Sequence, residues 1–211
     1  EHITNLEFSD GGSDIVVKKY IDKPFSYSME TPLFDKVLDF QFGTDVRGFI
    51  YACLGRIFKI QDNFGFMLYL LGEAGCGKSV IINIIKYCCA NIGVLNESYE
   101  VKYGISYFSN KDVILCDDLP KNIDKVFPQQ TFQTMITNGS VSSAVKNKDA
   151  ITIDKWNIPL LFAGNWFPSY LDKGQISRRL LVANFERSVP EAEKDTSLEA
   201  KIIENEIPSF I

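Results

Sequence analysis

One stretch of the chain combines the residue types that bind phosphate. Residues 72–79 match the pattern G-x-x-x-x-G-K-[ST] at every fixed position. The glycines let the backbone curl so that its N–H groups converge on phosphate oxygens. The lysine can then reach the β- and γ-phosphates, and the serine hydroxyl can complete a Mg²⁺ shell. The apolar run 66–71 predicts a buried strand before the loop, and residues 79–85 predict a helix after it. A glycine-rich turn that matches by accident is the alternative, and this context argues against it. The predicted nucleotide-binding residues are Gly72, Glu73, Ala74, Gly75, Cys76, Gly77, Lys78 and Ser79.

A pair of adjacent carboxylates follows a second apolar run. Asp117 and Asp118 come directly after residues 113–116, which read as a buried strand. In an open α/β sheet the carboxyl end of a strand faces the ligand crevice. There Asp117 could hold Mg²⁺, with Ser79, and Asp118 could polarise the water that attacks the γ-phosphate. Adjacent carboxylates are otherwise ordinary solvated turn residues, an alternative that the phosphate-binding pattern disfavours.

Three more polar side chains border the last two apolar runs. Asn165 follows residues 158–163, and its amide could hold the attacking water or the γ-phosphate, although Asn more often caps a helix or forms a turn. Arg178 and Arg179 precede residues 180–185. One of them could act as an arginine finger for a neighbouring subunit, which is worth about 10³–10⁵ in rate. Alternatively, both are surface charges beside a strand.

Two lysines at a hairpin tip are the candidates for contact with nucleic acid. Residues 141–145 and 150–153 flank Lys146-Asn147-Lys148-Asp149 and predict a hairpin. A tip rich in Lys and Asn is by default a soluble turn. If several subunits formed a ring, however, one tip from each would line a shared channel. Lys146 and Lys148 would then follow a phosphate backbone without reading its sequence.

The elements that must position these residues indicate an α/β fold. Strands that are apolar throughout, with helices between them, predict a parallel sheet covered by helices on both faces. Helical spacing of apolar residues from 33 to 60 predicts two helices before the core, and a helix is expected around 130–137. A short strand is expected at residues 15–17, and the acidic tail 191–206 is expected to be helical. We therefore divide the chain into an N-terminal, mainly helical segment (1–60), a nucleotide-binding core (61–190) and the start of a C-terminal helical lid (191–211).

The amino-acid composition of the chain argues against several classes of function. The 211 residues carry a net charge of −5 with a pI near 5.0, which argues against a general basic coat for nucleic acid. The only histidine, His2, is next to the N-terminal residue of the sequence, which argues against histidine-dependent catalysis and against metal sites with histidine ligands. The five cysteines lack zinc-ligand spacing and suit reduced thiols in an intracellular compartment. No apolar run approaches the roughly 20 residues of a membrane span, and no signal peptide is evident. Both termini suggest a domain cut from a longer protein.

The order of these signals resembles that of the superfamily 3 helicases of the AAA+ class. The phosphate-binding loop, the carboxylate pair, a lysine-bearing hairpin and an asparagine follow one another as in that family. The segment 135–148 looks like its hairpin motif, 161–168 like its sensor motif and 177–180 like its arginine region. The resemblance covers roughly residues 30–207 and is greatest to the primase-helicases of large DNA viruses, of the poxvirus type.

This resemblance implies an activity, cofactors and partners. It implies a hexameric ring that hydrolyses ATP with Mg²⁺ and moves 3′→5′ on single-stranded DNA to unwind duplex, at a replication site in the cytoplasm or nucleus of a host cell. A primase domain would belong to the full-length chain. The resemblance implies that Lys78 and Ser79 bind phosphate and Mg²⁺, that Asp117 holds the metal and that Asp118 activates the water. It also implies that Asn165 senses the γ-phosphate and that Arg178 or Arg179 acts on a neighbouring subunit, while Lys146 and Lys148 bind DNA. Asp118 stands where many AAA+ motors have Glu, so it is one methylene shorter.

Other classes remain open at this point. An AAA+ assembly or loader module would bind ATP and a protein partner without moving along DNA, and the net acidity suits it. An RNA-directed superfamily 3 ATPase is disfavoured by the long helical prefix and by the Phe-Pro pair after Asn165. A small-molecule kinase also uses a phosphate-binding loop, but the sequence has no acceptor-site or lid signature for one.

Overall fold

A five-stranded parallel sheet forms the centre of the protein. The computed structural model describes residues 20–58, 65–96, 104–145, 147–168 and 175–211. The strands are β1 (Met67–Gly72), β2 (Ile92–Val94), β3 (Val113–Cys116), β6 (Leu160–Gly164) and β7 (Leu180–Phe185). Their spatial order is β2-β3-β6-β1-β7, and every neighbouring pair is parallel. The carboxyl ends of all five strands therefore meet at one edge of the sheet.

Each central strand sends alternate side chains to two separate apolar cores. In β1, for example, Leu68 and Leu70 enter one core, whereas Met67 and Tyr69 enter the other. A strand buried on both faces needs apolar residues at every position, because successive side chains point to opposite sides. The apolar runs that predicted these strands reflect this double burial, and the prediction of a parallel sheet with helices on both faces is confirmed.

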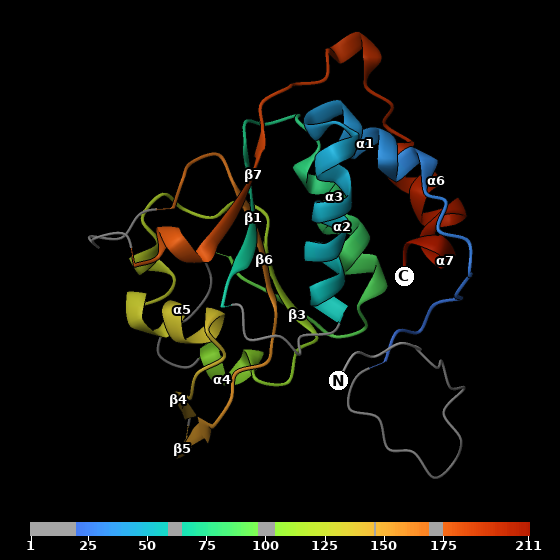
Figure 1. Ribbon diagram of the computed structural model, residues 1–211. Helices are drawn as coiled ribbons and strands as arrows, with labels where there is room; N and C mark the ends of the chain where they lie inside the picture. Colours follow the sequence, from blue (N-terminus) through green and yellow to red (C-terminus); the bar gives the residue numbers. More distant parts are fainter. Residues whose placement is uncertain (1–19, 59–64, 97–103, 146, 169–174) are drawn as a thin grey trace, which may run out of the picture.

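Helices from both ends of the chain cover one face of the sheet. The first core receives residues from α1 (Pro32–Phe42), α2 (Thr44–Phe58), α3 (Lys78–Cys88), α6 (Leu198–Asn205) and α7 (Ile207–Phe210). Figure 1 shows these helices together on one side of the sheet, with the C-terminus among them. Glu206 fixes the C-terminal helices to α1, since its carboxylate accepts the backbone N–H groups of Leu33 and Phe34 at 2.6 and 2.9 Å. These carboxylate bonds satisfy two donors that a helix start leaves without partners.

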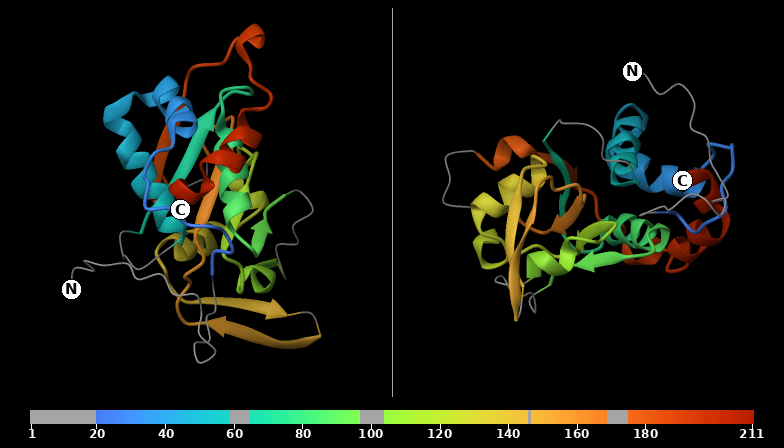
Figure 2. Two further views of the ribbon diagram at one scale, coloured as in Figure 1. Left: turned by 90° about the vertical axis from the view of Figure 1, so that its right-hand side faces the viewer. Right: turned by 90° about the horizontal axis from the view of Figure 1, so that it is seen from below.

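A second layer and a hairpin complete the fold. The other core receives residues from α4 (Gly104–Phe108), the 3-10 turn η1 (Ile123–Lys125) and α5 (Gln129–Ile136). The antiparallel strands β4 (Val141–Val145) and β5 (Lys148–Ile153) form a separate two-stranded sheet. This hairpin projects from the body at the end remote from the carboxyl edge (Figures 1 and 2). The 3-10 turns η2 (Ser177–Arg179) and η3 (Glu191–Glu193) flank β7 and the C-terminal connection.

Several local predictions need correction or extension. The two helices before the core, the helix near residue 130 and the hairpin are confirmed. The tail 191–206 is helical only from Leu198, apart from the short turn η3, because residues 194–197 take extended and turn conformations. Strand β2 and helix α4 were not predicted. The strand expected at 15–17 lies outside the described residues. None of the described helices has both the length and the apolar character that crossing a membrane requires.

Candidate functional site

The loop between β1 and α3 has the backbone shape that its glycines permit. Gly77 has a left-handed φ of 99° and stands at the N-cap of α3, where no side chain caps the helix. Left-handed φ values are costly for other residues. Gly72 is required for a different reason, because a Cβ there would lie 2.5 Å from the carbonyl oxygen of Phe185 on β7. The loop thus starts in close contact with the neighbouring strand and ends at a helix N-terminus, which favours anions through its exposed N–H groups and dipole.

Lys78 lies at the centre of the site. It is 7% exposed, and its Nζ donates hydrogen bonds to the carbonyl oxygens of Gly72 and Glu73 at 2.6 and 2.7 Å. The same atom lies 3.5 Å from Oδ1 of Asn165, which follows β6. A buried ammonium group needs such partners, because an unpaired charge is costly away from water. Ser79 is exposed at the start of α3. Lys78 and Asn165, predicted from separate parts of the sequence, are therefore in contact.

Sheet order brings the carboxylate pair to the same edge. Strand β6 pairs with β1 on one side and β3 on the other, so Asn165 emerges between the loop and the pair Asp117 and Asp118. Both aspartates are exposed, and Leu119 N donates to Ala163 O at 2.7 Å, which ties the segment after β3 to β6. Burial raises the pKa of the neighbouring Cys116 thiol to about 12, and the two carboxylates add to this shift.

Tyr69 is a site residue that the sequence did not reveal. Its side chain is fully buried on β1, and its hydroxyl donates to the carbonyl oxygen of Trp166 at 2.7 Å. Gly164 leaves room for it, since a Cβ there would lie 2.2 Å from the Tyr69 hydroxyl. Burial, with smaller contributions from Cys116 and Asp118, raises the pKa of Tyr69, so the hydroxyl stays protonated as a donor. Tyr69 therefore fixes the turn that carries Asn165. A tyrosine within an otherwise apolar strand was the available signal.

Gln41 is a second residue that sequence reasoning missed. From the end of α1 its Nε2 donates to Cys76 O at 2.9 Å and to Arg187 O at 2.6 Å, while its Oε1 accepts from Arg187 N at 3.0 Å. One amide thus joins the phosphate-binding loop to the segment that follows β7. No local sequence feature marks this residue, because both partners are distant in the chain.

The two arginines lie away from this cluster. Arg178 and Arg179 form η2, immediately before β7, and Leu180 at the start of β7 pairs with Met67 at the start of β1. They are therefore at the amino-terminal edge of the sheet, opposite the loop. Arg178 is exposed, whereas Arg179 is half-buried and donates from Nη1 to the carbonyl oxygen of Gln175. Partial burial, together with the charge of Arg178, lowers the pKa of Arg179.

The hairpin lysines are likewise not part of the cluster. Lys148 is exposed at the start of β5, on the projecting hairpin (Figure 2). Lys146 lies outside the described residues.

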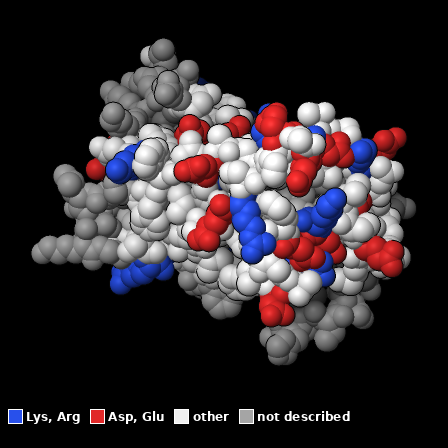
Figure 3. Space-filling model, turned by 90° about the horizontal axis from the view of Figure 1, so that it is seen from above, with Lys and Arg blue, Asp and Glu red and all other residues white. Residues whose placement is uncertain are grey.

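The face at the carboxyl edge, seen from above in Figure 3, carries basic side chains interspersed with acidic ones. Mixed charge of this kind does not resemble the basic stripe of a general nucleic-acid surface.

The donor set suits Mg²⁺ better than a metal held by protein alone. Among the described residues, no group of three or more His, Cys, Asp and Glu side chains could hold a metal ion. Ser79 and Asp117 offer hard oxygen donors at the same edge of the sheet. Mg²⁺ commonly binds through one or two such groups, with substrate phosphates and water as its other ligands. These residues therefore fit a magnesium–nucleotide complex.

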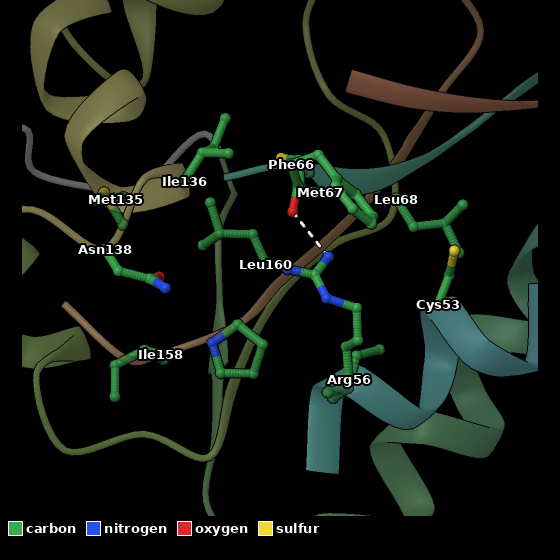
Figure 4. A pocket seen from close by; sticks show the side chains of 12 residues that line it. Cys53, Arg56, Phe66, Met67, Leu68, Met135, Ile136, Asn138, Ile158 and Leu160 are labelled. Carbon is green, nitrogen blue, oxygen red and sulfur yellow. Dashed lines mark hydrogen bonds between the residues drawn. The ribbon is translucent and has the colours of Figure 1, made fainter. Parts of the chain in front are cut away.

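A pocket at the other end of the sheet does not contain the predicted site residues. It lies between α2, α5 and the starts of β1 and β6 (Figure 4). Arg56 covers the ring of Phe66 at 4.0 Å and donates to its carbonyl oxygen at 2.9 Å. The other lining residues include Cys53, Met135 and Leu160. The predicted polar site residues lie at the carboxyl edge of the sheet instead. We therefore interpret this pocket as a gap between packed helices and strands.

Comparisons with known proteins identify a family and a fold. A family model described as "Family of unknown function (DUF5906)" matches residues 70–179, just over half of the 211-residue chain. No curated protein matches. Structures titled as the apo form and the A form of the NrS-1 C-terminal region are similar, with TM-scores of 0.69 and 0.68 and 18% identity. Both alignments cover 89% of this chain but only 46% and 45% of the NrS-1 chains. The chain therefore spans less than half of those structures and shares their fold.

Proposed function

This chain belongs to the family of unknown function DUF5906, and we propose that it is an ATP-driven DNA helicase motor domain of the superfamily 3 AAA+ type. One observation carries the proposal. Lys78, the carboxylates Asp117 and Asp118, and Asn165 meet at the carboxyl edge of three adjacent strands. That edge is where open α/β sheets bind nucleotides. The family match includes this whole group of residues but names no activity.

Each group has a role that follows from its chemistry. The backbone of residues 72–77 and the Lys78 ammonium bind the phosphates, and the start of α3 adds a favourable dipole. Ser79 and Asp117 would hold Mg²⁺, which when bound would neutralise charge on the phosphates. Asp118 accepts a proton from the attacking water, while Asn165 orients that water or the γ-phosphate. Lys78 keeps Asn165 close to the phosphates through the contact between their side chains.

A neighbouring copy of the chain would complete the site. The arginines lie at the amino-terminal edge of the sheet, so within one chain neither can reach the loop. A ring in which one protomer presents Arg178 to the loop of the next would supply the positive charge that phosphoryl transfer requires. In such a ring Lys146 and Lys148 would face a central channel and bind single-stranded DNA. The likeness to the NrS-1 C-terminal region supports the fold on which this arrangement depends.

The decisive experiment measures ATP hydrolysis with and without single-stranded DNA. The wild-type chain should hydrolyse ATP and should be stimulated by DNA, and Lys78→Ala should abolish nucleotide binding. Lys148→Ala should keep basal hydrolysis and lose the stimulation, whereas Lys36→Ala, which removes an exposed lysine of α1, should retain it. Wild-type protein that binds no ATP would refute the proposal, and normal unwinding by Lys148→Ala would refute the role of the hairpin.

A nucleotide-gated assembly module is the second candidate. Trp166 and Phe167, directly after Asn165, are 59% and 43% exposed, and exposed aromatic side chains beside a nucleotide site suit a protein partner. Such a module would hydrolyse ATP without separating DNA strands. A single-turnover unwinding assay therefore distinguishes the two functions, and comparison of DNA with RNA as the stimulating strand tests the RNA-directed alternative.

A further inference from the structure

The segment that follows β7 returns across the phosphate-binding loop. Val189 N donates to the carbonyl oxygen of Gly75 at 3.4 Å. Gln41 holds the start of the same segment, since it bonds both to Cys76 O and to the backbone of Arg187. The Arg187 guanidinium is itself fixed by the carbonyl oxygen of Phe40 at 2.9 Å. Hydrogen bonds to the loop and to α1 therefore hold this segment next to the phosphate-binding loop.

The segment brings a second ammonium group to the loop. A Cβ built on Gly75 would lie 3.7 Å from Nζ of Lys194 and 3.8 Å from its Cε. Gly75 is in the middle of the loop and exposed, with a left-handed φ of 80°. Because the Lys194 ammonium is this close to Gly75, it borders the space in which loop N–H groups would surround a phosphate. Lys78, the other cation of the site, approaches the loop from the buried side.

Lys194 is held in place only weakly. Its ammonium group pairs with Glu191, three residues earlier, and the two side chains are 38% and 86% exposed. Exposed ion pairs of this kind contribute about 0–1 kcal/mol, because water screens the charges. A triphosphate carries several negative charges and would compete well for this cation. Apart from Lys194, the predicted site has one cation, Lys78, and two carboxylates, Asp117 and Asp118. A second positive charge would therefore offset repulsion between these carboxylates and the phosphates.

The geometry points to Lys194 as a second phosphate-binding cation of the site, one that exchanges Glu191 for the nucleotide. This inference rests on the proposed function and extends it to a residue outside the sequence motifs. Lys194 contributes to nucleotide affinity, and Glu191 restrains it when no nucleotide is bound. The interaction is electrostatic, so its contribution should grow with the charge of the ligand and fall with ionic strength.

Calorimetric titration with ATP and ADP in the presence of Mg²⁺ tests the inference. Lys194→Ala should weaken ATP binding about fivefold, the effect of removing one charge-assisted contact near the surface, and ADP binding by less. Lys194→Arg should restore most of the affinity. Glu191→Gln should strengthen ATP binding about twofold, because the competing carboxylate is removed. The matched control is Lys201→Ala, which removes another exposed lysine, located on α6 and paired with Asp195 at 2.7 Å.

The results separate this inference from the proposed function. Equal ATP affinity in the wild type and Lys194→Ala, with Lys78→Ala still unable to bind, would overturn the inference and leave the proposed function standing. A wild-type chain that binds neither nucleotide would overturn both. An equal loss in Lys201→Ala would also refute the inference, since the effect would then reflect net charge rather than position. Melting temperatures of the Lys194, Glu191 and Lys201 variants should agree with the wild type, because these three side chains are on the surface.

Discussion

Removal of one buried hydroxyl should separate catalysis from nucleotide binding. In Tyr69→Phe the ring keeps its packing in the core, but the Trp166 carbonyl loses a hydrogen bond of 2.7 Å. The loss of a part-buried hydrogen bond of this kind costs about 1.5 kcal/mol. For a chain of this size the melting temperature should fall by about 3–6 °C. The turn that carries Asn165 then loses its restraint, and under the proposed function displacement of Asn165 would lower turnover steeply. We expect kcat to fall about tenfold, while ATP affinity changes less than twofold, because the phosphate-binding loop is intact.

Tyr51→Phe is the matched control for this substitution. The Tyr51 hydroxyl contacts Thr31 Oγ1 at 2.5 Å and donates to Asp35 Oδ1 at 2.8 Å, so it joins the start of α1 to α2 and not to the Asn165 turn. Its loss should lower the melting temperature to a similar extent and leave kcat unchanged. Thermal unfolding followed by circular dichroism and a steady-state ATPase assay provide both measurements. If Tyr69→Phe lowers kcat no more than Tyr51→Phe does, Tyr69 does not position the Asn165 turn.

Four further predictions concern the arginines and the thiols. Arg178→Ala should reduce ATP turnover about 10³-fold with unchanged ATP affinity, whereas Arg179→Ala should chiefly lower the melting temperature, because its guanidinium already bonds the chain's own backbone. Mixing Arg178→Ala with Lys78→Ala should restore part of the ATPase activity, since each variant supplies what the other lacks; no recovery would place the finger elsewhere. In native protein at pH 8, iodoacetamide should modify the partly exposed Cys89 and leave Cys116 unmodified, as measured by mass spectrometry. The reason is that a pKa of about 12 lowers the thiolate fraction of Cys116 about 10³-fold relative to an ordinary pKa near 9. The Cys116 proton is bound more tightly in the folded state, so its stabilising effect is present below pH 9 and is lost between about pH 9 and 12.

The strands and the loop could be predicted because their signals are local. A strand buried on both faces needs an unbroken apolar run, and the loop needs glycine where φ is positive, so both are visible in a few residues. Strand β2 escaped prediction because it has only three residues, Ile-Gly-Val. The tail was assigned too much helix because its acidic composition suits a helix surface, although Leu198 is the first residue with helical packing partners.

The contacts that complete the site could not be predicted, because they join distant parts of the chain. Tyr69 and Trp166 are 97 positions apart, and Gln41 and Arg187 are 146 apart. Whether such residues meet depends on the order of strands in the sheet, which periodicity does not determine. The position of β6 between β3 and β1 brings Asn165 to Lys78, and the residues alone predicted only that both lie at carboxyl ends of strands.

The length of the strands is the reason that the proposed site would need a second chain. Strand β1 runs from Met67, beside the arginine turn, to Gly72, where the loop starts, and β7 runs parallel to it over the same distance. Five residue steps in an extended strand cover about 17 Å. An arginine side chain extends much less than this, so parallel pairing of β1 and β7 keeps the guanidinium groups from their own loop. The same pairing leaves Arg178 exposed at the opposite edge, where a neighbouring protomer could meet it. Under the proposed function, separation of a cation from its own site by one strand length would make hydrolysis depend on assembly, and the mixing experiment measures that dependence directly.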